Sequence, residues 1–261
     1  MRATEPDAAA VPEATAPADR RLPWRVAEVL EVRPETARAS TLVLRVPGWP
    51  GHRPGQHVDV RLTAEDGYQA QRSYSIASPP EDGHLALTVE RLEDGEVSPY
   101  LVGELRPGDR FELRGPIGGY FVWDAAADGA LNLLAGGSGV VPLMAMLRHR
   151  AAAGSEVPAR LLYSARSLED VIYREELEER LAADPGLAVI YTLTRGQPAG
   201  WTGYARRIDE TMLGEVFGHA GDEGFYVCGP TTFVETAASA LVALGHDPGR
   251  IRTERFGPTG G

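Results

Sequence analysis

A glycine-rich turn in the second half of the chain has the composition of a phosphate-binding loop. Gly137, Ser138 and Gly139 follow an apolar run, and Pro142 then favours the first turn of a helix. Glycines let the backbone approach a pyrophosphate closely, and a helix N-terminus stabilises its negative charge. The pattern is GxGxxP and not the GxGxxG dinucleotide fingerprint, so a tight strand-to-helix turn without a ligand is the alternative. The turn is therefore a candidate pyrophosphate site.

Hydroxyl and basic side chains follow the next expected strand, where an adenosine ribose would lie. They are Ser164, Arg166 and Arg174. An NAD site usually has Asp or Glu at this position, and a carboxylate would repel a 2′-phosphate. Serine and arginine can instead bind that phosphate through charge-assisted hydrogen bonds, which favours NADPH over NADH. The alternative is that both arginines are solvated or pair with neighbouring carboxylates.

The single cysteine, Cys228, limits the redox chemistry that this sequence can support. It follows an apolar run and precedes Gly229 and Pro230. One thiol cannot form an internal disulfide, a CxxC zinc site or a four-thiolate iron–sulfur cluster. A cysteine at the end of a buried strand is ordinarily a small apolar residue. We therefore expect no metal site.

Composition indicates a globular protein and argues against two kinds of partner. The 261 residues carry 26 Lys+Arg against 37 Asp+Glu, a formal net charge of −11, and 43% of them are hydrophobic. An acidic chain without clustered basic residues is not typical of nucleic-acid binding. No apolar run approaches the ~20 residues of a membrane-spanning helix, and no secretory signal is evident. We expect a cytoplasmic protein with no membrane span.

The elements that must hold these residues change in type once along the chain. From about residue 24 to 123, short alternating runs are separated by Gly/Pro turns, which predicts an antiparallel β-barrel or sandwich. A short helix beginning at Ser98, as N-cap, interrupts it, with Pro99 at the first helical position. From residue 131 onward, apolar strands alternate with helices, among them one over residues 168–183, which predicts a doubly wound parallel sheet.

Three parts of the chain are therefore expected. Residues 1–20, rich in Ala, Pro and Glu, form a flexible leader. Residues 21–128 form the β-barrel domain, and residues 129–261 form the α/β domain. The candidate phosphate loop lies in the α/β domain, directly after its first strand.

Five segments in this order resemble the ferredoxin–NADP reductase superfamily. They are Arg72-Ser73-Tyr74-Ser75, Gly95-Glu96-Val97-Ser98, Gly115-Pro116-Ile117-Gly118, Gly137-x-Gly139-x-x-Pro142 and Cys228-Gly229-Pro230. The resemblance extends over nearly the whole chain after the leader. It implies that the barrel binds FAD and that the α/β domain binds NAD(P)H as substrate.

The resemblance also implies roles for residues of the barrel domain. Arg72 would bind the FAD pyrophosphate, which a guanidinium matches through two hydrogen bonds. Tyr74 would pack on the flavin, and Ser75 would hydrogen-bond its N5 atom. Further FAD contacts would come from three other positions. These are Gly95, Val97 and Ser98. The alternative for residues 72–75 is an ordinary alternating strand with Arg and Tyr pointing outward.

Two segments of the α/β domain would complete the active site by the same resemblance. Cys228 would lie near the nicotinamide C4 and align hydride transfer without acting as a nucleophile. Glu254 would supply a carboxylate beside the flavin, and Phe256 would cover the flavin face, with core packing as the alternative. Relatives of the plant type end in Tyr, whereas this chain continues through residues 257–261.

The function implied is that of a stand-alone FAD-dependent NAD(P)H oxidoreductase. It would take hydride from NAD(P)H, with NADPH favoured, and pass electrons to a ferredoxin or another redox protein. A flavin or quinone reductase with a diffusible acceptor is one alternative. A non-catalytic nucleotide-binding module is another, because fold alone does not fix function.

Overall fold

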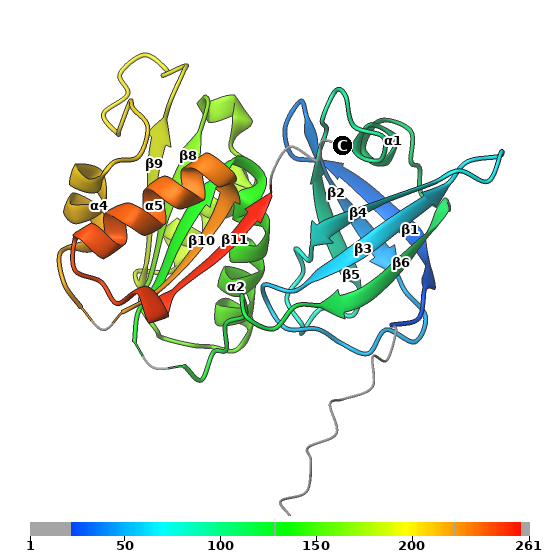
Figure 1. The fold of residues 1–261 in the computed structure, drawn as a ribbon, viewed down its shortest axis with the longest axis horizontal. Helices are drawn as coiled ribbons and strands as arrows, with labels where there is room; N and C mark the ends of the chain where they lie inside the picture. The colour runs from blue at the N-terminus through cyan, green and yellow to red at the C-terminus, as the bar shows by residue number, and fades with distance from the viewer. Residues whose placement is uncertain (1–21, 128, 222, 257–261) are drawn as a thin grey trace, which may run out of the picture.

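The structure is a computed structural model that describes residues 22–127, 129–221 and 223–256. Two sheets, each built from a different half of the chain, lie side by side (Figure 1). The expected leader over residues 1–20, the predicted domain boundary at residue 128 and the last residues, 257–261, lie outside the described part. Within the described part, no helix is long and apolar enough to cross a membrane.

The first sheet contains six antiparallel strands in the order β4-β3-β6-β1-β2-β5. Its strands are β1 (Arg25–Pro34), β2 (Ala39–Arg45), β3 (His57–Thr63), β4 (Gln69–Ser75), β5 (Leu85–Glu90) and β6 (Arg110–Ile117). An antiparallel bridge from Ile76 to Leu87 brings the two edge strands together, and aliphatic side chains fill the interior. The predicted antiparallel β-barrel is confirmed.

The short helix α1 (Ser98–Gly103) lies between β5 and β6, but its N-cap was wrongly predicted. Val97 occupies the N-cap position, and no side chain of the described residues caps the helix. Ser98 is the first helical residue, and its Oγ accepts a hydrogen bond from the Leu92 N–H at 3.0 Å. The hydroxyl therefore closes the loop that precedes the helix and is not available to cap it.

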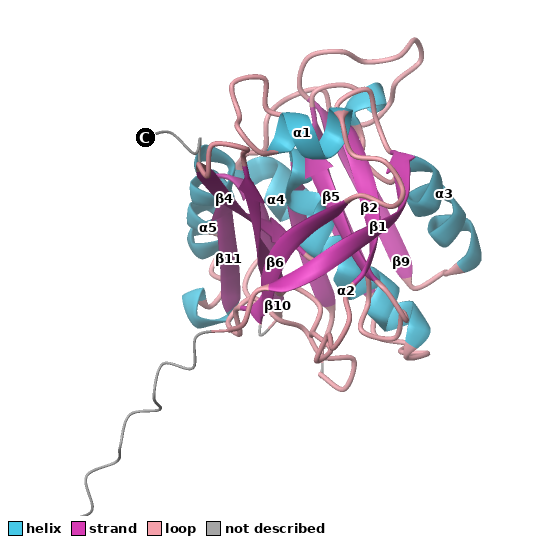
Figure 2. Ribbon diagram, turned by 90° about the vertical axis from the view of Figure 1, so that its right-hand side faces the viewer, coloured by secondary structure: helices cyan, strands magenta, loops and turns pink. Residues whose placement is uncertain are grey.

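The second sheet contains five parallel strands in the order β11-β10-β7-β8-β9. They are β7 (Leu131–Gly136), β8 (Ala159–Ala165), β9 (Leu187–Leu193), β10 (Gly224–Pro230) and β11 (Ile251–Phe256). The helices α2 (Val140–Ala152) and α3 (Arg174–Ala183) cover one face, and α4 (Glu210–Phe217) and α5 (Thr231–Ala243) cover the other (Figures 1 and 2). All residues of β7 are buried, because helices cover both faces. The predicted doubly wound sheet is confirmed.

The helix expected over residues 168–183 is interrupted. A 3₁₀ turn, η2 (Leu168–Asp170), is followed by Tyr173 with a φ of 61°, and α3 begins at the next residue. This left-handed conformation is uncommon for a residue other than glycine. Tyr173 is fully buried and its hydroxyl donates a hydrogen bond to Thr88 Oγ1 of the barrel. A contact with the other sheet, invisible to helical periodicity, fixes the break.

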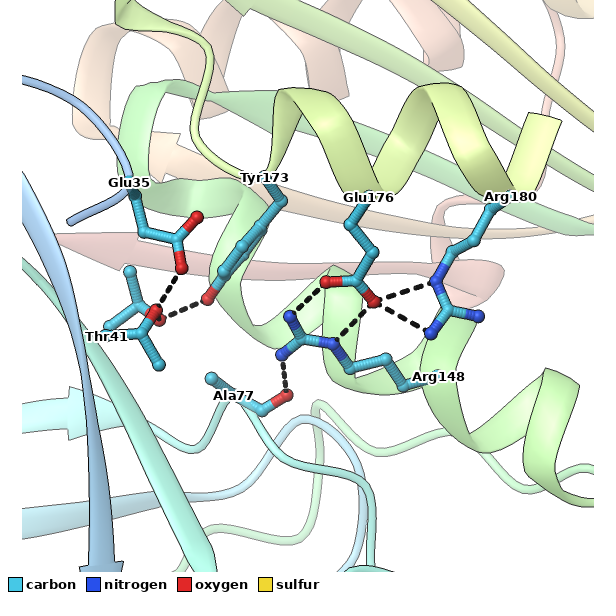
Figure 3. A network of polar contacts seen from close by, with 8 residues as sticks. Glu35, Thr41, Ala77, Arg148, Tyr173, Glu176 and Arg180 are labelled. Carbon is cyan, nitrogen blue, oxygen red and sulfur yellow. Dashed lines mark hydrogen bonds and ion pairs between the residues drawn. The ribbon is translucent and has the colours of Figure 1, made fainter. Parts of the chain in front are cut away.

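Arg148 of α2 is at the centre of the polar contacts between the two sheets (Figure 3). Its guanidinium donates to the Ala77 carbonyl oxygen at 2.7 Å and to both carboxylate oxygens of Glu176. It also lies over the Tyr173 ring, 4.6 Å from the centroid. Arg180 pairs with the same Glu176 carboxylate. The network ties α2 and α3 to the barrel and holds the two sheets in one arrangement.

Candidate functional site

The carboxyl ends of β7 and β10 form the point where the parallel sheet reverses its winding. The strands are neighbours, yet the helices that follow them, α2 and α5, lie on opposite faces. Ligands of doubly wound sheets bind in the crevice that such a reversal opens. The 3₁₀ turn η1 (Gly137–Gly139) follows β7, and Cys228, Gly229 and Pro230 end β10. Two predicted nucleotide segments thus flank this crevice.

The glycines of η1 are required by close contacts on one side and leave space on the other. A Cβ atom on Gly139 would lie 2.1 Å from the Cys228 carbonyl oxygen, so the loop backbone is pressed against β10. Gly137 has a φ of +54°, and among the described residues only a carboxylate oxygen of Glu90, at 4.0 Å, comes near its Cβ position. Ser138 is half-buried and Pro142 is buried in the first turn of α2. Pyrophosphate binding on this open side remains a prediction.

Cys228 is buried, with 1% of its surface exposed. Removal from water raises the pKa of the thiol well above its usual value, with a further contribution from the charge of Glu254. A thiol of this kind stays protonated near neutral pH and is a poor nucleophile. The environment is compatible with a contact role beside the nicotinamide and not with covalent chemistry.

Glu254 lies beside Cys228, since the two residues are register partners on β11 and β10. Burial raises the pKa of the Glu254 carboxyl to about 7. Its Oε2 is buried without a hydrogen-bond partner in the described part of the chain, and its Oε1 lies 3.8 Å from Nδ1 of His57. His57 is the register partner of Ser75. The three predicted catalytic residues, Ser75, Cys228 and Glu254, are therefore brought together where the two sheets meet.

His57 belongs to this site, although the sequence analysis missed it. It stands at the start of β3 on the same face as Ser75, and Ile117 of β6 is its partner on the other side. A titratable ring at the first position of an otherwise alternating strand was the available signal. Only the approach of β11 from the other sheet makes it a neighbour of Glu254.

The predicted FAD strand, β4, has its polar side chains engaged within the barrel. Arg72 Nη2 donates to Glu96 Oε2 at 2.9 Å, and Ser73 Oγ donates to Asp59 Oδ1 at 2.6 Å. Tyr74 packs against the barrel core, and burial raises the pKa of its hydroxyl. The exposed Arg72–Glu96 pair is weak, so a phosphate could replace the carboxylate. Their contact with FAD remains a prediction.

The second predicted FAD segment shapes the loop before α1. A Cβ on Gly95 would lie 2.9 Å from Ser98 Oγ, which leaves no room for a larger residue there. Val97 and Ser98 are buried. Phe256, at the end of β11, is 38% exposed beside Pro230 of β10, so the alternative of core packing for Phe256 is wrong.

At the ribose end, the structure separates the two predicted arginines. Ser164 is the register partner of Gly136, next to η1, and Arg166 follows β8 on the surface. The Arg195 N–H donates to the Arg166 carbonyl oxygen at 2.8 Å, which places a further exposed arginine beside it. Arg174 instead pairs with Glu178 along α3 at 2.9 Å. The sequence analysis missed Arg195 because it follows the next strand.

A large cleft of about 1060 Å³ lies elsewhere, between the barrel and α3. Arg33, Glu35, His84 and Arg148 are among its lining residues, whereas Ser75, Cys228 and Glu254 are not. Charged groups of both signs line it, and many are already paired with one another. The candidate site is therefore identified by its chemistry and not by cavity size. In the described residues, no group of three or more His, Cys, Asp or Glu could hold a metal ion.

Comparison with known families and proteins gives matches to both halves of the chain. The model of an oxidoreductase FAD-binding domain matches residues 28–122, and that of an oxidoreductase NAD-binding domain matches residues 133–239. The chain is 33% identical to the glycine betaine monooxygenase reductase subunit of Chromohalobacter salexigens, over 79% of this chain and 56% of that protein. It is 30% identical to the toluate 1,2-dioxygenase electron transfer component of Pseudomonas putida, over 78% and 58%. The chain thus spans less than two thirds of the length of these relatives.

A solved structure has the same arrangement of two sheets. The ferredoxin NADP⁺ reductase of Neisseria gonorrhoeae, determined with bound FAD and NADP, aligns with a TM-score of 0.76 at 20% identity. The alignment covers 89% of this chain and 98% of that one. At this identity the likeness shows the fold.

Proposed function

Since the chain belongs to the ferredoxin–NADP reductase superfamily, with an FAD-binding domain followed by an NAD-binding domain, we propose that it transfers electrons from NAD(P)H through FAD to a separate redox protein. Bound FAD would accept the hydride and release its two electrons one at a time. The residues of this chain would bind both nucleotides, align them and handle the accompanying proton.

One observation carries the proposal most directly. The crevice next to η1 is bordered by residues from both domains. They are Ser75 of the barrel and Cys228 and Glu254 of the parallel sheet. Hydride transfer requires two reacting atoms to be held a few ångströms apart, so a site shared by both domains suits a reaction between two bound nucleotides. Arg72 would bind the FAD pyrophosphate, and Tyr74 would contact the flavin.

NADPH is the proposed electron donor. Arg166 and Arg195 are adjacent, exposed and follow neighbouring strands of the parallel sheet. Two guanidinium groups at that edge can bind a 2′-phosphate, and Ser164 lies closer to the pyrophosphate loop. Arg174 contributes less to this proposal than the sequence predicted, because Glu178 already pairs with it.

The proposed acceptor is a one-electron redox protein, either a ferredoxin or the oxygenase component of a system like those named for the relatives. Cys228 is the single cysteine in the 261 residues, so this sequence holds no ligand set for a cluster of its own. A location in the cytoplasm remains a prediction from the sequence.

Anaerobic titration of the purified protein tests the function. A yellow protein that bleaches with NADPH and regains its colour on adding a one-electron acceptor supports the proposal, and acid release followed by chromatography identifies the flavin. A protein that binds nucleotide without bleaching would be a non-catalytic binding module. Faster turnover with quinone or free flavin than with any candidate redox protein would favour a diffusible acceptor.

A further inference from the structure

One side of strand β5 faces the α/β domain. Its other side fills the barrel interior with three aliphatic side chains, which are Leu85, Leu87 and Val89. Of the residues between them, Ala86 packs in a core shared with α2, and Thr88 accepts a hydrogen bond from the Tyr173 hydroxyl. Glu90 ends the strand on the same side, and its Oε2 lies 4.0 Å from the position that a Cβ atom on Gly137 would take. A carboxylate of the barrel therefore lies beside the predicted pyrophosphate loop, η1.

Glu90 carries a negative charge that no described residue pairs with. The side chain is half-buried and has no hydrogen-bond or ion-pair partner in that part of the chain. Arg91, next in sequence, pairs with Glu93 at 3.3 Å, and Arg38 donates to the Arg91 carbonyl oxygen. Burial raises the pKa of the Tyr163 hydroxyl in β8, and the charge of Glu90 adds to this rise. The unpaired charge of Glu90 thus acts across the domain boundary on the parallel sheet.

The N-terminus of α2 favours one anion at η1. The first turn of a helix presents unpaired N–H groups and a partial positive charge. Glu90 already brings a carboxylate close to this turn. A pyrophosphate bound on the open side of Gly137 would lie within a few ångströms of that carboxylate, and like charges repel strongly at such distances in a half-buried site. The carboxylate and the pyrophosphate therefore oppose one another at η1.

We propose that Glu90 competes with the NADPH pyrophosphate for η1, which lowers the affinity for the nucleotide and speeds the release of NADP⁺. This inference rests on the proposed function. Each turnover requires NADP⁺ to leave before the next NADPH binds, and product release limits the rate of many enzymes. Because Glu90 belongs to the barrel and η1 to the α/β domain, the competition depends on the contact between the two sheets.

Binding of two ligands tests the competition. NADP⁺ carries the pyrophosphate, whereas adenosine 2′-monophosphate keeps the 2′-phosphate and lacks the pyrophosphate. In calorimetric titrations of the holoprotein, Glu90→Gln should bind NADP⁺ about tenfold more tightly than wild type and adenosine 2′-monophosphate within about twofold of wild type. The gain should shrink as salt rises, because ions screen the repulsion. In stopped flow, NADP⁺ should leave Glu90→Gln several-fold more slowly than it leaves wild type.

Two further variants separate a local effect from a general one. Glu93→Gln is the matched control, since it removes the same charge from an exposed carboxylate that pairs with Arg91. It should change the NADP⁺ affinity by less than about twofold. Glu90→Lys should bind NADP⁺ more tightly than Glu90→Gln does, because it replaces repulsion of the pyrophosphate with attraction.

An NADP⁺ affinity in Glu90→Gln that is unchanged or weaker overturns the inference. An equal gain for adenosine 2′-monophosphate, or an equal gain in Glu93→Gln, also overturns it, because the effect would then come from the net charge of the chain and not from competition at η1. If wild type and Glu90→Gln both fail to bind any nicotinamide nucleotide, the proposed function fails as well. Reduction of the wild-type flavin by NADPH, with no gain in NADP⁺ affinity in Glu90→Gln, overturns the inference alone.

Discussion

At the scale of single residues, the site combines groups from distant parts of the sequence, and chemistry identified most of them. Ser75, Cys228 and Glu254 were predicted by type and motif, and register places all three near one point. His57 and Arg195 were missed because each gains its role from a neighbour on another strand. A side chain outside any motif cannot be assigned a functional role until the strand that packs next to it is known.

Nucleotide choice should depend on Arg166 and Arg195. The double variant Arg166→Ala/Arg195→Ala should lower kcat/KM for NADPH about a hundredfold and leave that for NADH within twofold, because each charge-assisted contact contributes ~1.5–3 kcal/mol before solvent screening. Arg174→Ala is the matched control, since its side chain pairs with Glu178. Initial rates with each nucleotide at low and high salt check this. An equal loss in Arg174→Ala would move the phosphate site to α3.

Glu254 should make stability depend on pH. Its carboxyl has a pKa of about 7 when folded against an ordinary value of 4.5, so the folded state holds its proton more tightly. The stability that this proton provides is complete below about pH 4.5 and is lost as pH rises through 7, a difference of about 3 kcal/mol. Glu254→Gln should therefore gain stability over wild type at pH 8 but not at pH 4.5. Urea denaturation of flavin-free protein measures this, and an equal gap at both pH values would contradict it.

At the scale of elements, local patterns predicted both sheets but not the details where elements touch. The apolar run of β7 and the alternation in the barrel strands each indicate a strand from local sequence alone. The break at Tyr173 does not, since it depends on Thr88 in the other half of the chain. The start of α1 was misplaced because the Ser98 hydroxyl binds the Leu92 N–H instead of the helix end.

The turn η1 should tolerate a methyl group differently at its two glycines. Gly139→Ala should destabilise the protein by about 2 kcal/mol or more, because the Cβ would lie 2.1 Å from a backbone oxygen of β10. Gly137→Ala should lose only about 1–2 kcal/mol from its positive φ, yet bind NADPH at least tenfold more weakly. Gly154→Ala, with a φ of +62° and open space, controls for that strain. Thermal denaturation and nucleotide titration distinguish them, and unchanged affinity in Gly137→Ala would place the pyrophosphate elsewhere.

At the scale of the whole molecule, function requires the two sheets to keep one relative position. The length of 261 residues and the change from alternating runs to a strand–helix repeat predicted two domains but contain nothing about how the two pack together. Small residues of the barrel, Ala39, Ala77 and Ala86, share a core with α2. Next to this small apolar contact, the polar network around Arg148 fixes the orientation of one sheet relative to the other (Figure 3).

Arg148→Met tests whether that network keeps the reacting atoms of the two domains aligned. Methionine keeps much of the side-chain volume but leaves the Ala77 carbonyl and one side of the half-buried Glu176 carboxylate without a donor. Removing one partner of a fully buried pair costs about 3–5 kcal/mol. The loss here should fall below that range, because the Glu176 side chain is 29% exposed and keeps Arg180 as a partner. Because a displacement of about 1 Å at the reacting atoms can slow a reaction ~100-fold, hydride transfer should fall far more than NADPH affinity.

Arg180→Met is the matched control for this last prediction. The substitution removes the other partner of Glu176, and in the described part of the chain the Arg180 side chain makes no hydrogen bond to the barrel. Stability should therefore fall by less than about 1 kcal/mol, and the rate of flavin reduction should not change. Urea denaturation and stopped-flow flavin reduction measure both effects in each variant. If Arg148→Met resembles Arg180→Met in both, then the apolar contact alone positions the sheets, and the arginine serves only to neutralise Glu176.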